Sequence, residues 1–151
     1  MVKYIVASQD DMELLMRSRL EMLRVVNELP PEYRFDSGLV ETTREYFANG
    51  NQTTVLALDG EKVAGCATLC YVEMMPTFSH PTGKRAHLMN VYTAREYRRQ
   101  GIALRMLELL IEEAREKGVT EISLDATEEG RPLYQRCGFA GSSECMVLSL
   151  Q

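Results

Sequence analysis

The most informative segment of this sequence is LMNVYTAREYRRQGIA, residues 88–103. Its first half has the pattern of a strand, its middle is a tight basic turn, and its end opens a long helix. That helix is predicted from about Gly101 to Lys117, because apolar residues recur three and four positions apart on one face. The segment therefore predicts a strand, a turn and a helix that packs on a sheet.

The basic turn is a candidate site for a small anion. Between Arg95 and Arg105 the net charge is +3, whereas the whole chain carries −5. The first four N–H groups of a helix have no partner inside the helix, and the helix dipole adds partial positive charge there, so such an end binds phosphate. The turn lacks the Gly-Lys-Ser/Thr ending of a nucleotide P-loop and the three-glycine spacing of a dinucleotide site, which excludes both.

The other helices and strands are predicted from hydrophobic periodicity, and their ends from Pro, Gly and Asp-Gly residues. We expect a first helix that starts at Ser8 or Asp10 and ends before Pro30. The other predicted helices are Leu39–Ala48 and Arg131–Arg136, and the predicted strands are Tyr4–Ala7, Thr54–Leu58, Val63–Tyr71, Arg85–Thr93, Glu121–Ala126 and Met146–Leu150. This order predicts a mixed sheet with helices on its faces, an α/β or α+β fold.

The composition is that of one globular domain, residues 1–151, with 45% hydrophobic and 26% charged residues. No run approaches the ~18 apolar residues of a membrane span, and no secretory signal precedes the first strand. We therefore expect a cytoplasmic protein with no membrane partner, and the net charge of −5 argues against a nucleic-acid partner. Its cysteines are expected to be reduced and to bind no metal: they are Cys66, Cys70, Cys137 and Cys145.

Two motifs resemble those of the GNAT superfamily of N-acetyltransferases. The run RRQGIA, residues 98–103, fits the pattern (R/Q)-x-x-G-x-(G/A), and LYQRCGF, residues 133–139, is similar to L-Y-x-x-x-G-F. The order of predicted elements agrees over essentially the whole chain. The resemblance implies a mostly antiparallel sheet of six to seven strands with about four helices. It also implies a bulge in the strand that ends at Thr93 and a splay between this strand and Glu121–Ala126.

By the same resemblance, the slot between these two strands holds acetyl-CoA as cosubstrate, with its pyrophosphate on the basic turn. The residues implied in binding it are Val91, Tyr92, Thr93, Arg98, Arg99, Gln100, Gly101, Ile102, Ala103, Thr127 and Tyr134. Two positions depart from the family pattern. Thr127 stands where many members have Asn, which weakens a contact with pantetheine, and Arg95 stands where many have Pro.

The resemblance also places three candidates for proton transfer. Tyr134 is implied as the general acid that protonates the departing thiolate, the alternative being a packed tyrosine with its hydroxyl bound to backbone. His87 and Glu73 are candidates for the base that takes a proton from the amine, although a surface or core histidine and a solvated carboxylate are common. The N–H of Val91 is expected to polarise the thioester carbonyl.

The expected function is therefore acetyl transfer from acetyl-CoA to a primary amine of a small molecule, by direct attack in a ternary complex. The acceptor site is expected between the loops Asn27–Gly38 and Met74–Gly83. The carboxylates there favour a cationic small molecule or a peptide amine: Glu28, Glu32, Asp36 and the nearby Glu73. Two alternatives stay open: an acetyltransferase for protein or peptide amines, and a non-catalytic acyl-CoA-binding sensor. We expect a homodimer, because the apolar last strand, Met146–Leu150, is an edge that a soluble protein would cover.

Overall fold

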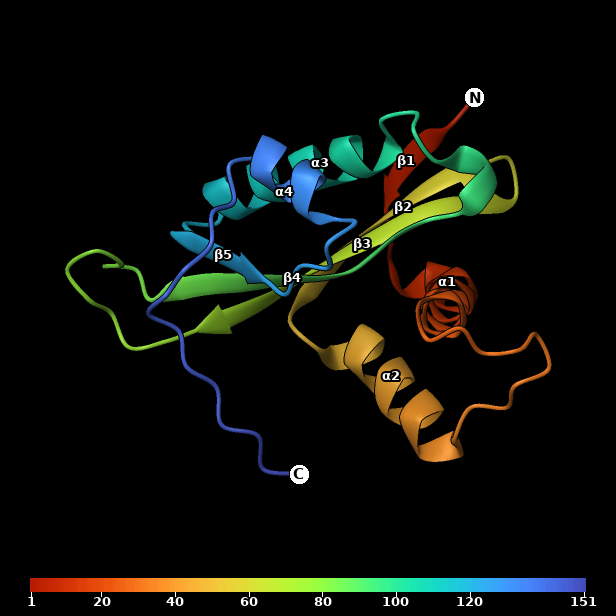
Figure 1. Cartoon of the computed structure of the whole chain (residues 1–151), viewed down its shortest axis with the longest axis horizontal. Helices are drawn as coiled ribbons and strands as arrows, with labels where there is room; N and C mark the ends of the chain where they lie inside the picture. The colour runs from red at the N-terminus through yellow and green to blue at the C-terminus, as the bar shows by residue number, and fades with distance from the viewer.

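A computed structural model describes all residues, 1–151 (Figure 1). The helices are α1 (Met12–Val26), α2 (Ser37–Asn49), α3 (Ile102–Glu116) and α4 (Arg131–Arg136), with short 3-10 turns at Gln9–Asp11 and Arg95–Tyr97. The strands are β1 (Lys3–Val6), β2 (Gln52–Asp59), β3 (Lys62–Glu73), β4 (Lys84–Thr93) and β5 (Glu121–Leu124). None of the helices combines the length and apolar character needed to cross a membrane.

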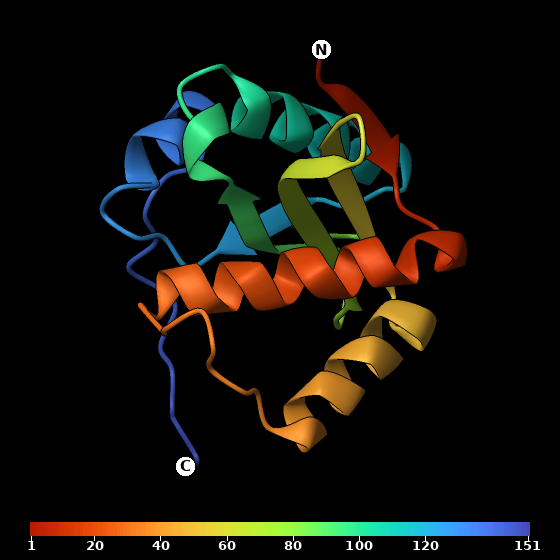
Figure 2. The ribbon, with the colours of Figure 1, turned by 90° about the vertical axis from the view of Figure 1, so that its right-hand side faces the viewer.

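The strands form one mixed sheet in the order β1-β2-β3-β4-β5. Each of the first three pairings is antiparallel, whereas β4 and β5 run parallel because α3 connects them. Figures 1 and 2 show α1 and α2 on one face of the sheet and α3 and α4 on the other. The predicted mixed sheet with helices on both faces is confirmed.

Alternation along the strands divides the core between the two faces. Five α3 side chains are buried against one face: Ile102, Met106, Leu107, Leu110 and Ala114. They pack with Val55 and Ala57 of β2, whereas Leu56 between them points to the opposite face and packs with Leu15 and Phe47. The sheet is therefore covered on both sides, and α3 is held by the larger of the two clusters.

The turn after β4 is tied to the β2–β3 hairpin. The Tyr97 hydroxyl donates a hydrogen bond of 2.7 Å to Asp59 Oδ2 at the end of β2. This bond stabilises the neutral phenol and the ionised carboxylate, so it raises the pKa of Tyr97 and lowers the pKa of Asp59. Asp59 pairs with Lys62 across a two-residue turn, in which Gly60 takes a φ of +62°. The β2–β3 hairpin thus holds the basic turn in place through the contact between Asp59 and Tyr97.

The expectation of six to seven strands is wrong, because the sheet has five. The predicted last strand, Met146–Leu150, forms no pairing, and its apolar side chains are exposed, Met146 by 93% and Leu150 by 92%. After α4 the chain leaves the helix layer and descends past the edge of the sheet (Figure 1). The alternating pattern of this segment has no partner strand, and the homodimer based on it stays a prediction.

We expect Leu107→Ala to lower the free energy of unfolding by about 3 kcal/mol, because Leu107 is fully buried between α3 and the sheet. Leu148→Ala is the matched control, since Leu148 is 82% exposed and its truncation should change stability by less than about 0.5 kcal/mol. Urea unfolding followed by circular dichroism measures both. A large loss in Leu148→Ala would mean that the C-terminal segment packs in solution.

The Tyr97 to Asp59 hydrogen bond predicts a pH-dependent contribution to stability. The pKa of Asp59 is depressed in the folded state, so the contribution is present above the ordinary carboxyl pKa of 3.8 and is lost as the pH falls below it. We expect Tyr97→Phe to lower Tm at pH 7, and we expect its difference from the wild type to be smaller at roughly pH 3. The ion pair of Asp59 with the Met1 amino group, 3.5 Å away, is the same in both proteins. A Tm difference that does not change between these pH values would contradict the assignment.

Candidate active site

The candidate site begins where β4 and β5 separate. Parallel pairing joins residues 85–88 of β4 to residues 121–124 of β5 and then stops. Residues 89–93 continue β4 along β3 alone, while the chain after Leu124 leaves the sheet toward α4. The expected splay is therefore confirmed, and the β4–β5 gap lies between residues 89–93 and 125–127.

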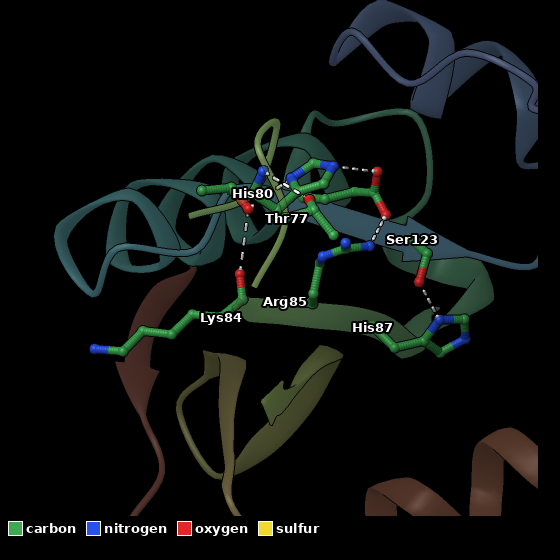
Figure 3. A network of polar contacts seen from close by, with 8 residues as sticks. Thr77, His80, Lys84, Arg85, His87 and Ser123 are labelled. Atoms are coloured by element: carbon green, nitrogen blue, oxygen red, sulfur yellow. Dashed lines mark hydrogen bonds and ion pairs between the residues drawn. The ribbon is translucent and has the colours of Figure 1, made fainter. Parts of the chain in front are cut away.

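A network of polar side chains holds the two strands together at their paired end (Figure 3). Arg85 of β4 donates to Glu121 of β5 at 2.9 Å. His80, in the β3–β4 loop, lies 2.8 Å from Thr120 Oγ1 through Nδ1 and 3.5 Å from Glu121 through Nε2. The β4–β5 gap consequently opens in one direction only, toward the N-terminus of α3.

A β-bulge interrupts β4 beside the β4–β5 gap. Thr68 faces Met89 and Cys66 faces Tyr92, so the single residue between Thr68 and Cys66 opposes both Asn90 and Val91. Asn90 has a φ of +59°, a left-handed conformation that asparagine tolerates better than most residues. The bulge expected before Thr93 is thus present.

The basic turn exposes the N-terminus of α3. Gly101 is the N-cap, with a φ of +78°, and no side chain caps the first turn of the helix. A Cβ at this position would meet no atom within 4 Å, so the need for glycine is conformational and the space outside it is open. Arg98 and Arg99 are exposed beside it, and Arg98 Nε donates to the Thr93 carbonyl at 3.0 Å. Unpaired backbone N–H groups and two guanidinium groups therefore meet at one end of the β4–β5 gap.

The residues expected to bind acetyl-CoA fall into three groups around this gap. Val91, Tyr92 and Thr93 form the end of β4, residues 98–103 form the turn, and Thr127 and Tyr134 lie on the side of α4. Thr93 Oγ1 is buried and has no hydrogen-bond partner, which fits a polar ligand lying along β4. The Thr127 hydroxyl, in contrast, accepts a hydrogen bond of 3.1 Å from the Gly130 N–H, just before the start of α4.

Tyr134 lies on α4, half-buried, with its ring edge against Phe139 at a centroid distance of 6.0 Å. Burial raises the pKa of Tyr134, and the nearby Cys137 contributes in the same direction. No hydrogen bond within the chain engages its hydroxyl, unlike a packed tyrosine bonded to backbone. Gly130 sets the place of the ring, because a Cβ there would lie 2.9 Å from Tyr134 Cε2. The phenol is therefore protonated and free to donate.

His87 lies on the opposite face of the sheet, beside the paired part of β4 and β5. Its Nδ1 is 2.7 Å from Ser123 Oγ (Figure 3), and its Nε2 is 3.6 Å from Asp125 Oδ2. His87 precedes Val91 by four residues, about 13 Å along the strand. Glu73 is exposed and faces Lys84, three residues farther from Val91 than His87. The structure thus brings His87 near the β4–β5 gap and leaves Glu73 at the far end of the sheet.

One part of the site was missed in the sequence analysis: the contact between α1 and the bulge. Arg19 Nη1 donates to Asn90 Oδ1 at 3.2 Å, and Asn90 is 5% exposed. Arg19 follows Leu15 by four residues and precedes Met22 by three, so it occupies a position on the apolar stripe of the first helix. A charged residue on that stripe was the available signal.

Comparisons with known proteins agree with this geometry. The family model described as acetyltransferase (GNAT) family matches residues 20–139. A glucosamine 6-phosphate N-acetyltransferase from Trypanosoma brucei brucei is 27% identical over 134 residues, 88% of each chain. A probable glucosamine 6-phosphate N-acetyltransferase 2 from Oryza sativa subsp. japonica is 39% identical over 66 residues, 44% of this chain and 40% of that protein.

A solved structure extends the likeness to nearly the whole fold. It is a "predicted acetyltransferase" from Clostridium acetobutylicum, described with acetyl-CoA, and it has a TM-score of 0.85 and 29% identity over 99% of this chain and 97% of that chain. The match to the family model covers the strand gap, the bulge and the basic turn. The chain therefore belongs to the acetyltransferase (GNAT) family and is an acyltransferase.

Proposed function

We propose that this enzyme transfers the acetyl group of acetyl-CoA to a primary amine of a small molecule, by direct attack within a ternary complex. One observation carries the proposal: β4 and β5 part beside an uncapped helix N-terminus. A parted strand pair admits an extended ligand, and the helix end binds the anionic part of that ligand. Acetyl-CoA, which this family uses, has both parts: an extended pantetheine arm and a pyrophosphate.

The binding groups match the cosubstrate part by part. The backbone N–H groups of residues 99–103 and the guanidinium groups of Arg98 and Arg99 would bind the pyrophosphate. Pantetheine would lie along the end of β4, where its amide groups could reach the backbone of Val91 and the unpaired Thr93 hydroxyl. Tyr92 and Thr127 border this path, although the Thr127 hydroxyl already accepts a hydrogen bond.

In the proposed reaction the amine nitrogen attacks the thioester carbonyl carbon, and the carbon–sulfur bond then breaks. The Val91 N–H would stabilise negative charge on the carbonyl oxygen. Tyr134 would give its proton to the departing sulfur. A phenol of pKa ~10 is a weaker acid than a thiol of pKa ~8.5, so this transfer is uphill by about 2 kcal/mol and requires good positioning. Burial raises the pKa of Tyr134, which keeps the donor protonated and also adds to the cost of giving up the proton.

Proton removal from the amine is assigned to His87, acting through water. About 13 Å of strand separates His87 from Val91, which is too far for direct contact with a nitrogen at the thioester. Its hydrogen bond with Ser123 orients the ring. Glu73 is a weaker candidate for the base, because the β3–β4 register places it farther away than His87.

The curated relatives point to the class of acceptor. Two of them are described as glucosamine 6-phosphate N-acetyltransferases, and both this sugar phosphate and its product are small molecules. Glucosamine 6-phosphate is therefore the first acceptor to test, in a panel that also holds polyamines, amino acids and a lysine peptide. Thiol release from acetyl-CoA measures turnover. Activity with the peptide alone would favour the protein acetyltransferase, and binding without any turnover would favour the sensor.

Gly101→Glu should abolish the binding of acetyl-CoA, because it places a carboxylate where the pyrophosphate would lie. Gly118→Glu is a matched control at the other end of α3. Gly118 has a φ of +80°, close to the +78° of Gly101, and a Cβ there would make only ordinary contacts. Both variants therefore carry the same charge and similar backbone strain. Calorimetry should show binding in Gly118→Glu alone, and equal affinities in the two variants would refute the site.

Tyr134→Phe should lower kcat by about 100-fold or somewhat less while the affinity for acetyl-CoA hardly changes, because one hydroxyl is lost and the ring packing stays. Tyr4→Phe serves as the control, since Tyr4 packs on the same core cluster from β1. Steady-state kinetics and calorimetry on the folded variants separate the two effects. An unchanged chemical step in single-turnover experiments would exclude Tyr134 as the acid.

A further inference from the structure

We propose that Arg19 is a positioning residue for the acetyl transfer: through Asn90 it holds the β4 bulge in the geometry that aims the Val91 N–H at the thioester carbonyl. The inference rests on the proposed function, because it concerns the donor that polarises this carbonyl. Arg19 itself lies on α1 and is assigned no contact with the reacting atoms. Its effect on the reaction is exerted through the backbone of the bulge.

The bulge needs side-chain support to keep its shape. A non-glycine residue in the left-handed region persists where its surroundings fix it, and Asn90 has a φ of +59°. The surroundings supply that support. Asn90 Oδ1 accepts from Arg19 Nη1 at 3.2 Å, and Asn90 Nδ2 donates to Thr68 Oγ1 at 3.1 Å. Two elements, α1 and β3, therefore hold one asparagine side chain from two sides.

The peptide unit between Asn90 and Val91 is held directly as well. The Cys66 thiol donates to the Asn90 carbonyl oxygen at 3.3 Å. In a trans peptide the C=O and the N–H of the following residue point in opposite directions. The Val91 N–H therefore points away from the Cys66 sulfur. A rotation at Asn90 would turn this N–H out of line, so the side chain of Asn90 controls the direction of the proposed oxyanion donor.

On the Thr68 side of Asn90, the hydrogen bonds continue into the sheet. Thr68 Oγ1 lies 2.7 Å from Thr54 Oγ1, and Thr54 in turn donates to Gln52 Oε1 at 2.7 Å. These three residues belong to β2 and β3, so they fix Asn90 relative to the sheet. Arg19 fixes it relative to α1. Without Arg19, the acceptor oxygen of a nearly fully buried amide would lose its partner, and only the contact with Thr68 would hold the side chain.

Partial burial of the charged Arg19 side chain costs desolvation energy, which argues that its contact with Asn90 is not incidental. Its guanidinium is partly buried, its hydrogen bonds go to Asn90 and to the Met22 sulfur, and no carboxylate pairs with it. Burial lowers the pKa of the Arg19 guanidinium, although an arginine stays charged throughout the physiological range. A methionine or leucine on this stripe would pack without that penalty. An arginine can donate a hydrogen bond to Asn90 Oδ1, which an apolar residue at this position cannot do.

Three variants test the proposal. Arg19→Leu removes the donor, Arg19→Lys keeps a cationic N–H donor of nearly the same reach, and Arg17→Leu removes the same charge from an exposed position on the same helix. We expect Arg19→Leu to lower kcat by about 10- to 100-fold with the acetyl-CoA KM within about threefold of wild type, since small misplacements of a transition-state donor have effects of this size. Arg19→Lys should recover most of the loss, and Arg17→Leu should match the wild type.

A second readout follows the bulge itself. Backbone amide hydrogen exchange of residues 88–93 should become faster in Arg19→Leu and stay unchanged in Arg17→Leu. This measurement does not depend on turnover, so it tests the positioning role even if the wild type acetylates no amine, an outcome that would refute the proposed function separately. If Arg19→Leu does not fold, Asn90→Gly breaks the same hydrogen bond from the other side and keeps the left-handed backbone available.

Two results would overturn the proposal. One is unchanged amide exchange at the bulge in both Arg19→Leu and Asn90→Gly. The other is a loss confined to the KM of the acceptor, which would make Arg19 a substrate-binding residue. A fall in kcat shared by Arg19→Leu and Asn90→Gly, with faster exchange and recovery in Arg19→Lys, would support it.

Discussion

The extent of hydrogen bonding between β4 and β5 determines where a ligand can bind in this fold, because two paired strands leave no room for a ligand between them. The pairing lasts for four residues on each strand and then ends. At the paired end, Arg85 and Glu121 connect the strands. At the open end, the bulge shifts β4 and the chain after Leu124 turns toward α4. A site for an extended molecule therefore results from where hydrogen bonds stop, and the helices are arranged around that interruption.

Much of this arrangement was predictable because its signals are local. Apolar residues three and four apart, a proline in the first turn of a helix, and the short turn after Asp59 each act within a few residues of the chain. These signals placed α3, α4 and the β2–β3 hairpin to within a few residues. The bulge and the splay came from the resemblance to a family, since nothing in the pattern of residues 88–93 alone distinguishes a bulged strand from a regular one.

What could not be predicted depends on distant partners. Met146–Leu150 has the composition of a strand, but a strand exists only where another strand accepts its hydrogen bonds, and β5 accepts none from it. The contact of Arg19 with Asn90 joins residues 71 positions apart. A sequence shows that Arg19 interrupts an apolar stripe, yet only the packing of α1 on the sheet shows which group receives its hydrogen bond.

The close approach of Gly130 to Tyr134 has a consequence for how variants of this enzyme should be interpreted. Position 130 carries no functional group, yet any side chain there would meet the Tyr134 ring edge at 2.9 Å and push the phenol aside. Under the role proposed for Tyr134, a Gly130→Ala enzyme would lose activity although the hydroxyl itself is still present. Combined with a smaller residue at position 134, the same change would be accommodated. The two positions consequently form a coupled pair, and substitutions at them should not have additive effects.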